Sequence, residues 1–184
     1  MSARRSDAQR NYARILAVAE QEVAALGAEV SLEHIARVAG VGSATVRRHF
    51  PSKRALLDAV FHEGVEALHD RAVELAAGED ARDALIEWLT ALVTYSTSAR
   101  GMAVALLRDD AETDHRHPCD RLIDAGEPLV KRAIDAGAAP AGVTAADLVT
   151  LVTGIVLATE QHRDQAAEAG RLLAMAVRGI APQP

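Results

Sequence analysis

Apolar residues recur at every third or fourth position along most of the 184-residue chain. This is the spacing of amphipathic helices rather than the alternation of half-buried strands. The pattern therefore predicts an all-α protein of about nine helices. We expect helices at residues 6–26, 32–39, 43–49, 52–77, 81–99, 102–110, 119–136, 144–161 and 164–179. The helix at 119–136 contains Pro128, where we expect it to break or to begin late.

The first ten residues carry Arg4, Arg5 and Arg10 without apolar periodicity. They fit either a flexible arm that reaches a minor groove or phosphates, or a disordered terminus. The first helix is then expected to begin at Ser6 or Asp7, because both residue types are good N-caps.

The stretch from Ser31 to Arg54, SLEHIARVAGVGSATVRRHFPSKR, predicts two short helices, a tight turn at Gly40 and a basic entry into a third helix. Val46 and Phe50 lie four residues apart and form the inward face of the second short helix. Its outward positions are Ser43, Ala44, Thr45, Arg47, Arg48 and His49. Small residues permit close approach to DNA, and Arg can bond bidentately to guanine or pair with phosphate. We therefore expect a helix-turn-helix at residues 31–50, with this helix in a major groove.

The long helix that follows begins at a candidate phosphate site: Ser52 is a good N-cap, and Lys53 lies in the first turn. Backbone N–H groups and a lysine at a helix N-terminus together favour an anion.

Charge is distributed unevenly. Residues 1–54 hold nine basic and five acidic side chains, whereas the whole chain has a net charge of −6. The asymmetry indicates that only the N-terminal part meets a polyanion. The alternative is a drift of composition over a solvated surface.

The helix predicted at residues 144–161 is apolar around most of its circumference, which is unusual for a surface helix, and the last predicted helix is also apolar. Thr150, Gly154 and Ala158 form a ridge of small residues at a spacing of four. Either the two helices form a four-helix bundle with a second copy of the chain, or both are internal core helices. For the bundle we expect contacts from Leu148, Leu151, Val152, Ile155, Leu172 and Met175.

Aromatic residues make up only 3% of the chain, so each one in the C-terminal part is a candidate for ligand binding as well as for the core. We expect a small hydrophobic effector, and no cofactor, in a pocket formed by several helices. The candidate pocket residues are Phe61, Trp88, Tyr95, Met102 and Cys119.

The polar segment around residues 109–120 contains metal-ligating residue types at a spacing of two, in Asp114, His115, His117, Cys119 and Asp120. Structural zinc sites use paired Cys or His ligands from two segments. Only one cysteine is present, so we expect a solvated loop and no metal.

The segment SLEHIARVAGVGSATVRRHFPSKRALLDAVF resembles the DNA-binding motif of the TetR (AcrR-like) family of bacterial transcriptional regulators. The run His-Phe-Pro-Ser-Lys followed by Leu-Leu is its most specific part, and the resemblance covers about residues 8–62. Lys53 matches the family's phosphate-contacting lysine. Arg47 stands where the family commonly has Tyr, which leaves the base preference open.

The resemblance implies a helix-turn-helix DNA-binding domain at residues 1–51 and a helical effector-binding and dimerisation domain at residues 52–184. It implies a cytoplasmic, ligand-responsive repressor that binds a palindromic operator in double-stranded DNA as a homodimer. The chain lacks the common catalytic motifs and any apolar run long enough for a membrane span, so we expect neither an enzyme nor a membrane protein. The alternative is a helical module that binds small molecules or proteins without reading DNA.

Overall fold

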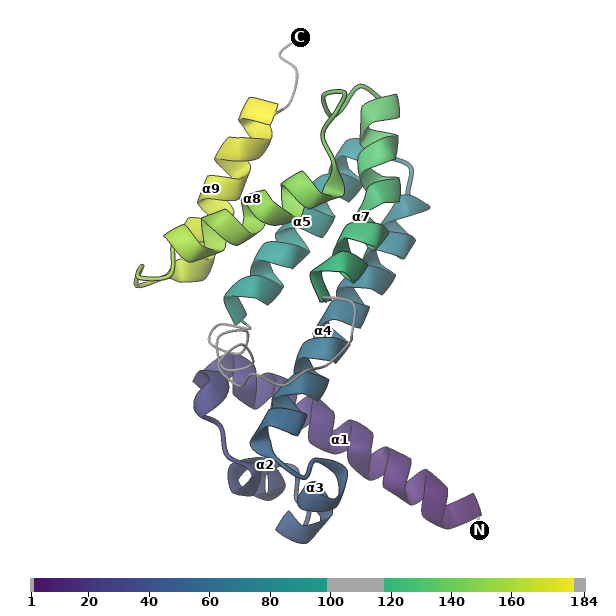
Figure 1. Cartoon of the computed structure of the whole chain (residues 1–184), viewed down its shortest axis with the longest axis vertical. Coiled ribbons are helices and arrows are strands. Elements are labelled where there is room, and N and C mark those ends of the chain that lie inside the picture. Colours follow the sequence, from purple (N-terminus) through teal and green to yellow (C-terminus); the bar gives the residue numbers. More distant parts are fainter. Residues whose placement is uncertain (1, 99–117, 181–184) are drawn as a thin grey trace. The chain divides into compact units, whose positions relative to one another are not determined.

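The computed structural model describes residues 2–98 and 118–180 (Figure 1). These ranges contain eight α-helices and one short 3-10 helix, without any strand, so the predicted all-α fold is confirmed. Packing divides the described residues into two compact units. The first unit contains residues 2–63 and Ser98, and the second contains residues 64–97 and 118–180.

The first unit consists of α1 (Ser2–Leu26), a 3-10 helix (Gly27–Glu29), α2 (Leu32–Val38), α3 (Ser43–His49) and the first part of α4 (Lys53–Ala76). The bounds of α2, α3 and α4 agree with those predicted to within one residue. Ser52 caps α4, as predicted: its Oγ accepts a hydrogen bond from the N–H of Ala55 at 3.0 Å.

Helix α1 begins at Ser2 and includes Arg4, Arg5 and Arg10, so the prediction of a flexible or disordered N-terminal stretch is wrong for residues 2–10. No Gly or Pro interrupts residues 2–26, and Ala and Arg are strong helix formers. An ion pair between Asp7 and Arg10, three residues apart, adds to the stability of this turn.

All four helices contribute to the core of the first unit. The buried side chains include Ile15, Ala19 and Val23 of α1, Ile35 and Ala36 of α2, Val46 of α3, Phe50, and Leu56, Leu57 and Val60 of α4. Complete burial of a large aliphatic or aromatic side chain contributes about 1.5–3 kcal/mol. The short helices α2 and α3 therefore depend on this core, since isolated helices of their length are unstable in water.

Polar contacts fix the entry of α2 against α1. The N–H of His34 donates to Ser31 Oγ at 3.1 Å and caps α2, as predicted for Ser31. Arg37 donates to Nδ1 of the His34 ring at 2.8 Å, so Nε2 carries the proton that it shares with Glu22 on α1, 2.5 Å away. The imidazole thus bridges α2 and α1.

The second unit consists of the remainder of α4 and of α5 (Ala81–Ser98), α7 (Pro118–Asp135), α8 (Ala145–Ala158) and α9 (Gln165–Ile180). Helix α8 packs against both α7 and α9. Its N-terminus has a capping box, in which Thr144 Oγ1 accepts from the N–H of Asp147 and the Asp147 carboxylate accepts from the N–H of Thr144. Within the described ranges, no helix is long and apolar enough to cross a membrane.

Helix α7 runs without interruption through Pro128, so the predicted break or late start there is wrong. Proline removes the hydrogen bond to the carbonyl four residues earlier, which belongs to Asp124. Both Asp124 and Pro128 lie on the exposed side of the helix, where water can hydrate that carbonyl. The helix therefore tolerates the proline.

Two glycines allow aromatic side chains of α5 to lie directly on neighbouring helices. A Cβ atom at Gly126 of α7 would lie 2.4 Å from Cη2 of Trp88. A Cβ atom at Gly64 of α4 would lie 2.1 Å from Cε2 of Tyr95. Because any side chain at either position would displace the ring, these contacts set how closely α4, α5 and α7 pack.

Arg132 on α7 binds the C-terminal end of α4. Its Nη1 donates to the carbonyl of Ala76 at 2.7 Å, and its Nη2 donates to the carbonyl of Gly78 at 2.7 Å. The last carbonyls of a helix have no partner within the helix and carry partial negative charge. The guanidinium of Arg132 donates hydrogen bonds to these carbonyls and brings a positive charge next to them. Arg132 therefore stabilises the end of α4.

We predict that Arg132→Ala lowers the free energy of unfolding by about 1–3 kcal/mol, because the carbonyls of Ala76 and Gly78 lose a charged donor. Urea unfolding followed by circular dichroism measures the change. The control is Lys131→Ala, since Lys131 is exposed and, among the described residues, pairs only with Asp135 on its own helix. Equal losses in the two variants would contradict a specific role for Arg132.

Candidate functional site

The turn between α2 and α3 is formed by a glycine in the left-handed region. Gly40 has φ +64°, which costs glycine little and other residues more. Its N–H donates to the carbonyl of Arg37, and the N–H of Val41 donates to the carbonyl of Ala36 at 3.0 Å. This pair of bonds is a Schellman motif, which ends α2 and directs the chain into α3.

The orientation of α3 is fixed by its apolar side. Val46 and Phe50 are completely or almost completely buried, as predicted for the inward face. Tyr12 of α1 covers Phe50 with its ring, at a centroid distance of 5.1 Å, and meets the ring of His49 edge to face at 5.9 Å. The burial of Val46 and Phe50 therefore leaves the opposite face of α3 exposed.

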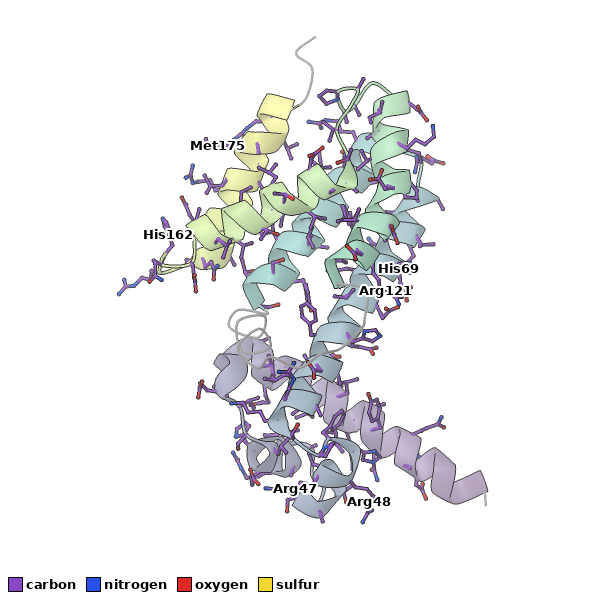
Figure 2. The ribbon with its side chains drawn as sticks, viewed as in Figure 1. Arg47, Arg48, His69, Arg121, His162 and Met175 are labelled. Carbon is purple, nitrogen blue, oxygen red and sulfur yellow. The ribbon has the colours of Figure 1, made fainter. Side chains whose placement is uncertain are left out.

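That exposed face carries the residues predicted to meet DNA. Ser43, Ala44, Arg47 and Arg48 are exposed, while Thr45 and His49 are half-buried. Figure 2 labels Arg47 and Arg48 on this helix. Two guanidinium groups beside small and hydroxyl-bearing side chains can donate to guanine edges or to phosphates. Their contact with DNA stays a prediction.

Arg47 forms an ion pair with Glu33 of α2. The pKa of the Glu33 carboxyl lies below its ordinary value because the carboxylate accepts hydrogen bonds from its own backbone N–H and from Arg47. Sequence analysis missed Glu33, as it missed Tyr12. A contact between positions 33 and 47 leaves no periodic signal, and the role of Tyr12 depends on the packing of α1 over Phe50.

Lys53 is the first residue of α4 and is half-buried. It forms no ion pair with any residue that the structure describes, whereas its neighbour Arg54 approaches Asp58 at 3.7 Å. The ammonium group thus lies beside the N-terminus of α4, as the phosphate-site prediction requires.

The predicted effector pocket divides between the two units. Phe61 packs against the core of the first unit, whereas Trp88 and Tyr95 belong to the second. Trp88 is completely buried, and its Nε1–H has no hydrogen-bond partner among the described residues. Met102 and the side chain of Cys119 lie outside what the structure describes. The five-residue pocket stays a prediction.

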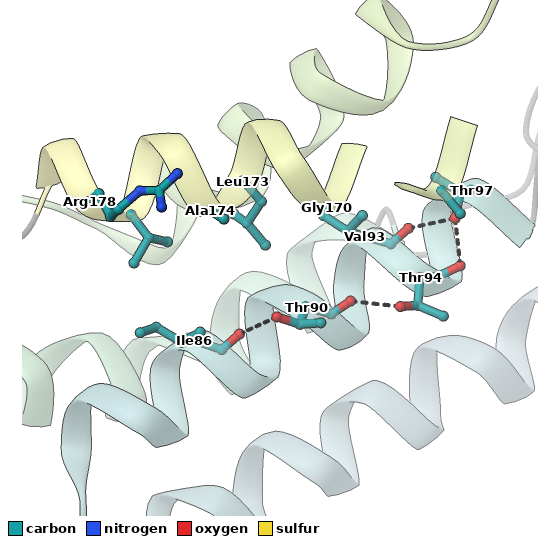
Figure 3. A pocket seen from close by; sticks show the side chains of 11 residues that line it. Ile86, Thr90, Val93, Thr94, Thr97, Gly170, Leu173, Ala174 and Arg178 are labelled. Carbon is teal, nitrogen blue, oxygen red and sulfur yellow. Dashed lines mark hydrogen bonds between the residues drawn. The ribbon is translucent and has the colours of Figure 1, made fainter. Parts of the chain in front are cut away.

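The structure shows a groove in the second unit that sequence analysis missed. It lies between α5 and α9 and has a volume of about 380 Å³ (Figure 3). We call it the α5–α9 groove. It is lined by Ile86, Thr90, Val93, Thr94 and Thr97 from α5, and by Ala166, Gly170, Leu173, Ala174, Val177 and Arg178 from α9. The repeated threonines at positions 90, 94 and 97 were the signal available in the sequence.

The threonines present a largely apolar wall to the groove. Thr90 donates its hydroxyl hydrogen to the carbonyl of Ile86 at 2.8 Å, and Thr94 and Thr97 donate to α5 carbonyls in the same way. Their donors are therefore used within the helix. Arg178 is the one charged residue of the lining, and it forms no ion pair with any described residue. The groove thus combines an apolar wall with one cation.

The last two helices expose only part of the set predicted for a dimer, and the predicted interface stays a prediction. Leu148, Val152 and Ile155 are buried within their own chain, and Leu151 and Leu172 are half-buried. Met175, which belongs to the predicted set, has 50% of its surface exposed, and Leu157, which does not, has 64% exposed. The small residues Thr150, Gly154 and Ala158 are all exposed, and they form what we call the α8 ridge.

The stretch with Asp114, His115 and His117 lies outside the described residues. Asp120, at the start of α7, is exposed. Among the residues that the structure describes, no three His, Cys, Asp or Glu side chains are grouped so that they could hold a metal ion.

Two family models match the chain. The model of bacterial regulatory proteins of the tetR family matches residues 15–60, and the model of the C-terminal domain of SbtR-like transcriptional regulators matches residues 80–182. No curated protein matches. The first match contains α2, α3 and the turn between them, so the predicted helix-turn-helix is confirmed.

Solved structures agree with both models. A TetR transcriptional regulator of Streptomyces coelicolor is 31% identical, with a TM-score of 0.78, and the match covers 94% of this chain and 99% of that one. A TetR regulatory protein of Mycobacterium vanbaalenii is 32% identical, with a TM-score of 0.71, and the match covers 97% and 99%. With its exposed basic helix in a helix-turn-helix and with both halves matched, the chain belongs to the TetR family of DNA-binding transcriptional regulators.

Proposed function

We propose that the protein is a ligand-responsive repressor that binds a palindromic operator as a homodimer. The observation that carries this proposal is the exposed basic face of α3, which is held outward by the burial of Val46 and Phe50 within the segment that matches the TetR family. Arg47 and Arg48 would reach base edges or phosphates, with Ser43, Ala44, Thr45 and His49 beside them.

Lys53 has the position of a phosphate anchor in this proposal. It lies at the N-terminus of α4, directly after the turn that follows α3, and it has no competing carboxylate among the described residues. A phosphate held there would fix the register of α3 on the duplex without reading its sequence.

We predict that Lys53→Ala weakens binding to every duplex and lowers the slope of log Kd against log salt by about one unit, because one phosphate contact is lost. Fluorescence anisotropy at several salt concentrations, with the protein's own upstream DNA and a scrambled duplex, measures both effects. The control is Lys131→Ala, since Lys131 lies on α7 in the second unit. An unchanged slope would remove Lys53 from the phosphate contacts.

The proposed dimer uses the α8 ridge. A Cβ atom added at Gly154 would meet nothing within 4 Å, so this part of α8 is open to a partner. Small residues at a spacing of four allow two helices to approach closely, and Leu157 offers an apolar side chain beside them. Met175 extends the apolar surface on α9. A two-fold dimer would present two copies of α3 to two half-sites about 34–36 Å apart, or a multiple of this distance.

We predict that Leu157→Asp weakens dimerisation by roughly 2 kcal/mol or more, as expected for a buried residue at the centre of an interface. Analytical ultracentrifugation over a range of concentrations measures the monomer–dimer equilibrium. The control is Val73→Asp on α4, because Val73 has a similar exposed fraction, 58%, compared with 64% for Leu157. If Leu157→Asp leaves the equilibrium unchanged, the α8 ridge is not the dimer interface.

The α5–α9 groove is the proposed effector site. Its volume of about 380 Å³ falls within the range of small-molecule sites, and its lining is mainly apolar. Arg178 provides a cation for a carboxylate or another anionic group. The effector would thus have an apolar body and one anionic head. Coupling to DNA binding would pass through α4, since this helix contributes residues to both units.

We predict that Ala174→Phe weakens binding of decanoate by about tenfold or more, because the new ring fills the groove. Isothermal titration calorimetry measures the affinity, and fluorescence of Trp88, the single tryptophan of the chain, reports changes in the second unit. The control is Ala167→Phe, an exposed α9 position that does not line the groove. Equal binding by wild type and Ala174→Phe would place any decanoate site elsewhere.

A further inference from the structure

The ion pair between Glu33 and Arg47 places a carboxylate on the surface that is proposed to meet DNA. Glu33 lies in the first turn of α2, and Arg47 is the residue of α3 that stands where the family commonly has Tyr. We infer that Glu33 is a specificity-determining residue, which positions the Arg47 guanidinium for a base and disfavours binding to phosphates alone. The inference rests on the proposed DNA-binding function.

The Glu33 carboxylate pairs with one of the two arginines of α3 and leaves the other without a carboxylate partner among the described residues. Arg47 and Arg48 are neighbours and both exposed, but within the described chain only Arg47 has a carboxylate partner. On the α2 side, Arg37 and His34 belong to a separate network that ends at Glu22 of α1. Glu33 is therefore the acidic group that acts on Arg47.

The ion pair contributes little to the folding of the first unit. The side chains of Arg47 and Glu33 are 58% and 60% exposed, and pairs in such positions are screened by water and salt. The core around Val46, Phe50 and Ile35 holds α2 and α3 together instead. The effect of Glu33 is thus expected in DNA binding rather than in stability.

A carboxylate affects an arginine beside DNA in two ways. It occupies one edge of the guanidinium and restricts its rotamers, while the remaining N–H donors stay available for O6 and N7 of a guanine. It also cancels one positive charge near the phosphates. Non-specific affinity comes almost entirely from phosphate contacts, so it is reduced more than operator affinity. Both effects raise the preference for the operator.

The test is Glu33→Gln, which keeps the size and the hydrogen-bonding oxygen of the side chain but removes its charge. Anisotropy titrations use the protein's own upstream DNA and a scrambled duplex of the same length. We expect tighter binding to the scrambled duplex, with a salt slope steeper by up to about one unit. The ratio of operator to non-specific affinity should fall by roughly fivefold or more, the lower limit of what one bidentate Arg–guanine pair contributes.

Two controls separate positioning from general charge. Glu29→Gln removes an exposed acid of the same unit that is not part of the pair, so it should leave the affinity ratio unchanged. In an Arg47→Gln background, Glu33→Gln should no longer change the base preference measured by single substitutions across the operator, because no guanidinium remains to be positioned.

Each failure has a distinct signature. If wild type shows no preference for the upstream DNA over the scrambled duplex, the proposed function itself is wrong. If wild type shows the preference but Glu33→Gln keeps both the affinity ratio and the base preference, the inference about Glu33 alone is overturned. The inference about Glu33 is also overturned if Glu29→Gln lowers the affinity ratio as much as Glu33→Gln does. It is likewise overturned if Glu33→Gln still changes the base preference in the Arg47→Gln background.

Discussion

The burial of Val46 and Phe50 is the constraint on which the proposed DNA-binding surface depends. Helix α3 has seven residues, which is too short for a helix that is stable by itself. Val46 of α3 and Phe50, which directly follows the helix, enter a core built by α1, α2 and α4, and the ring of Tyr12 covers Phe50 from α1. Since only one face of α3 remains outside, Arg47 and Arg48 lie on the surface that is proposed to meet DNA. The Schellman turn at Gly40 then sets where this face begins.

In the second unit, helix α9 has two sides with different proposed roles. Ala174 and Val177 line the α5–α9 groove, whereas Met175 is exposed next to them on the helix. An effector and a second copy of the chain would therefore act on the same helix. The contacts of Trp88 with Gly126 and of Tyr95 with Gly64 connect α5 to α7 and to α4. A shift of α5 by a ligand would accordingly reach α4, which also belongs to the first unit.

Much of the fold could be predicted from the sequence because helix signals are local. Apolar spacing, the cap residues Ser31 and Thr144, and the glycine stop at Gly40 located the helices closely. At Pro128 the prediction was wrong because solvent can compensate for the lost hydrogen bond. At residues 2–10 it was wrong because helix propensity extends α1 beyond its apolar pattern. The exposed face of α3 was predicted from its buried residues. Its ion pair with Glu33 depends on how α2 and α3 meet, and this contact leaves no periodic signal in a single sequence. The α5–α9 groove depends on α9 meeting α5, and the threonines of α5 indicate only one of its two walls.

The most direct test of the account is hydroxyl-radical footprinting of the protein on its own upstream DNA. Two copies of α3 held by one two-fold dimer should protect two patches related by symmetry, separated by about one helical turn, 34–36 Å, or by a multiple of it. Substitutions in either patch should weaken protection of both. A single protected patch, or uniform protection along the duplex, would contradict the claim that a dimer reads two half-sites with α3.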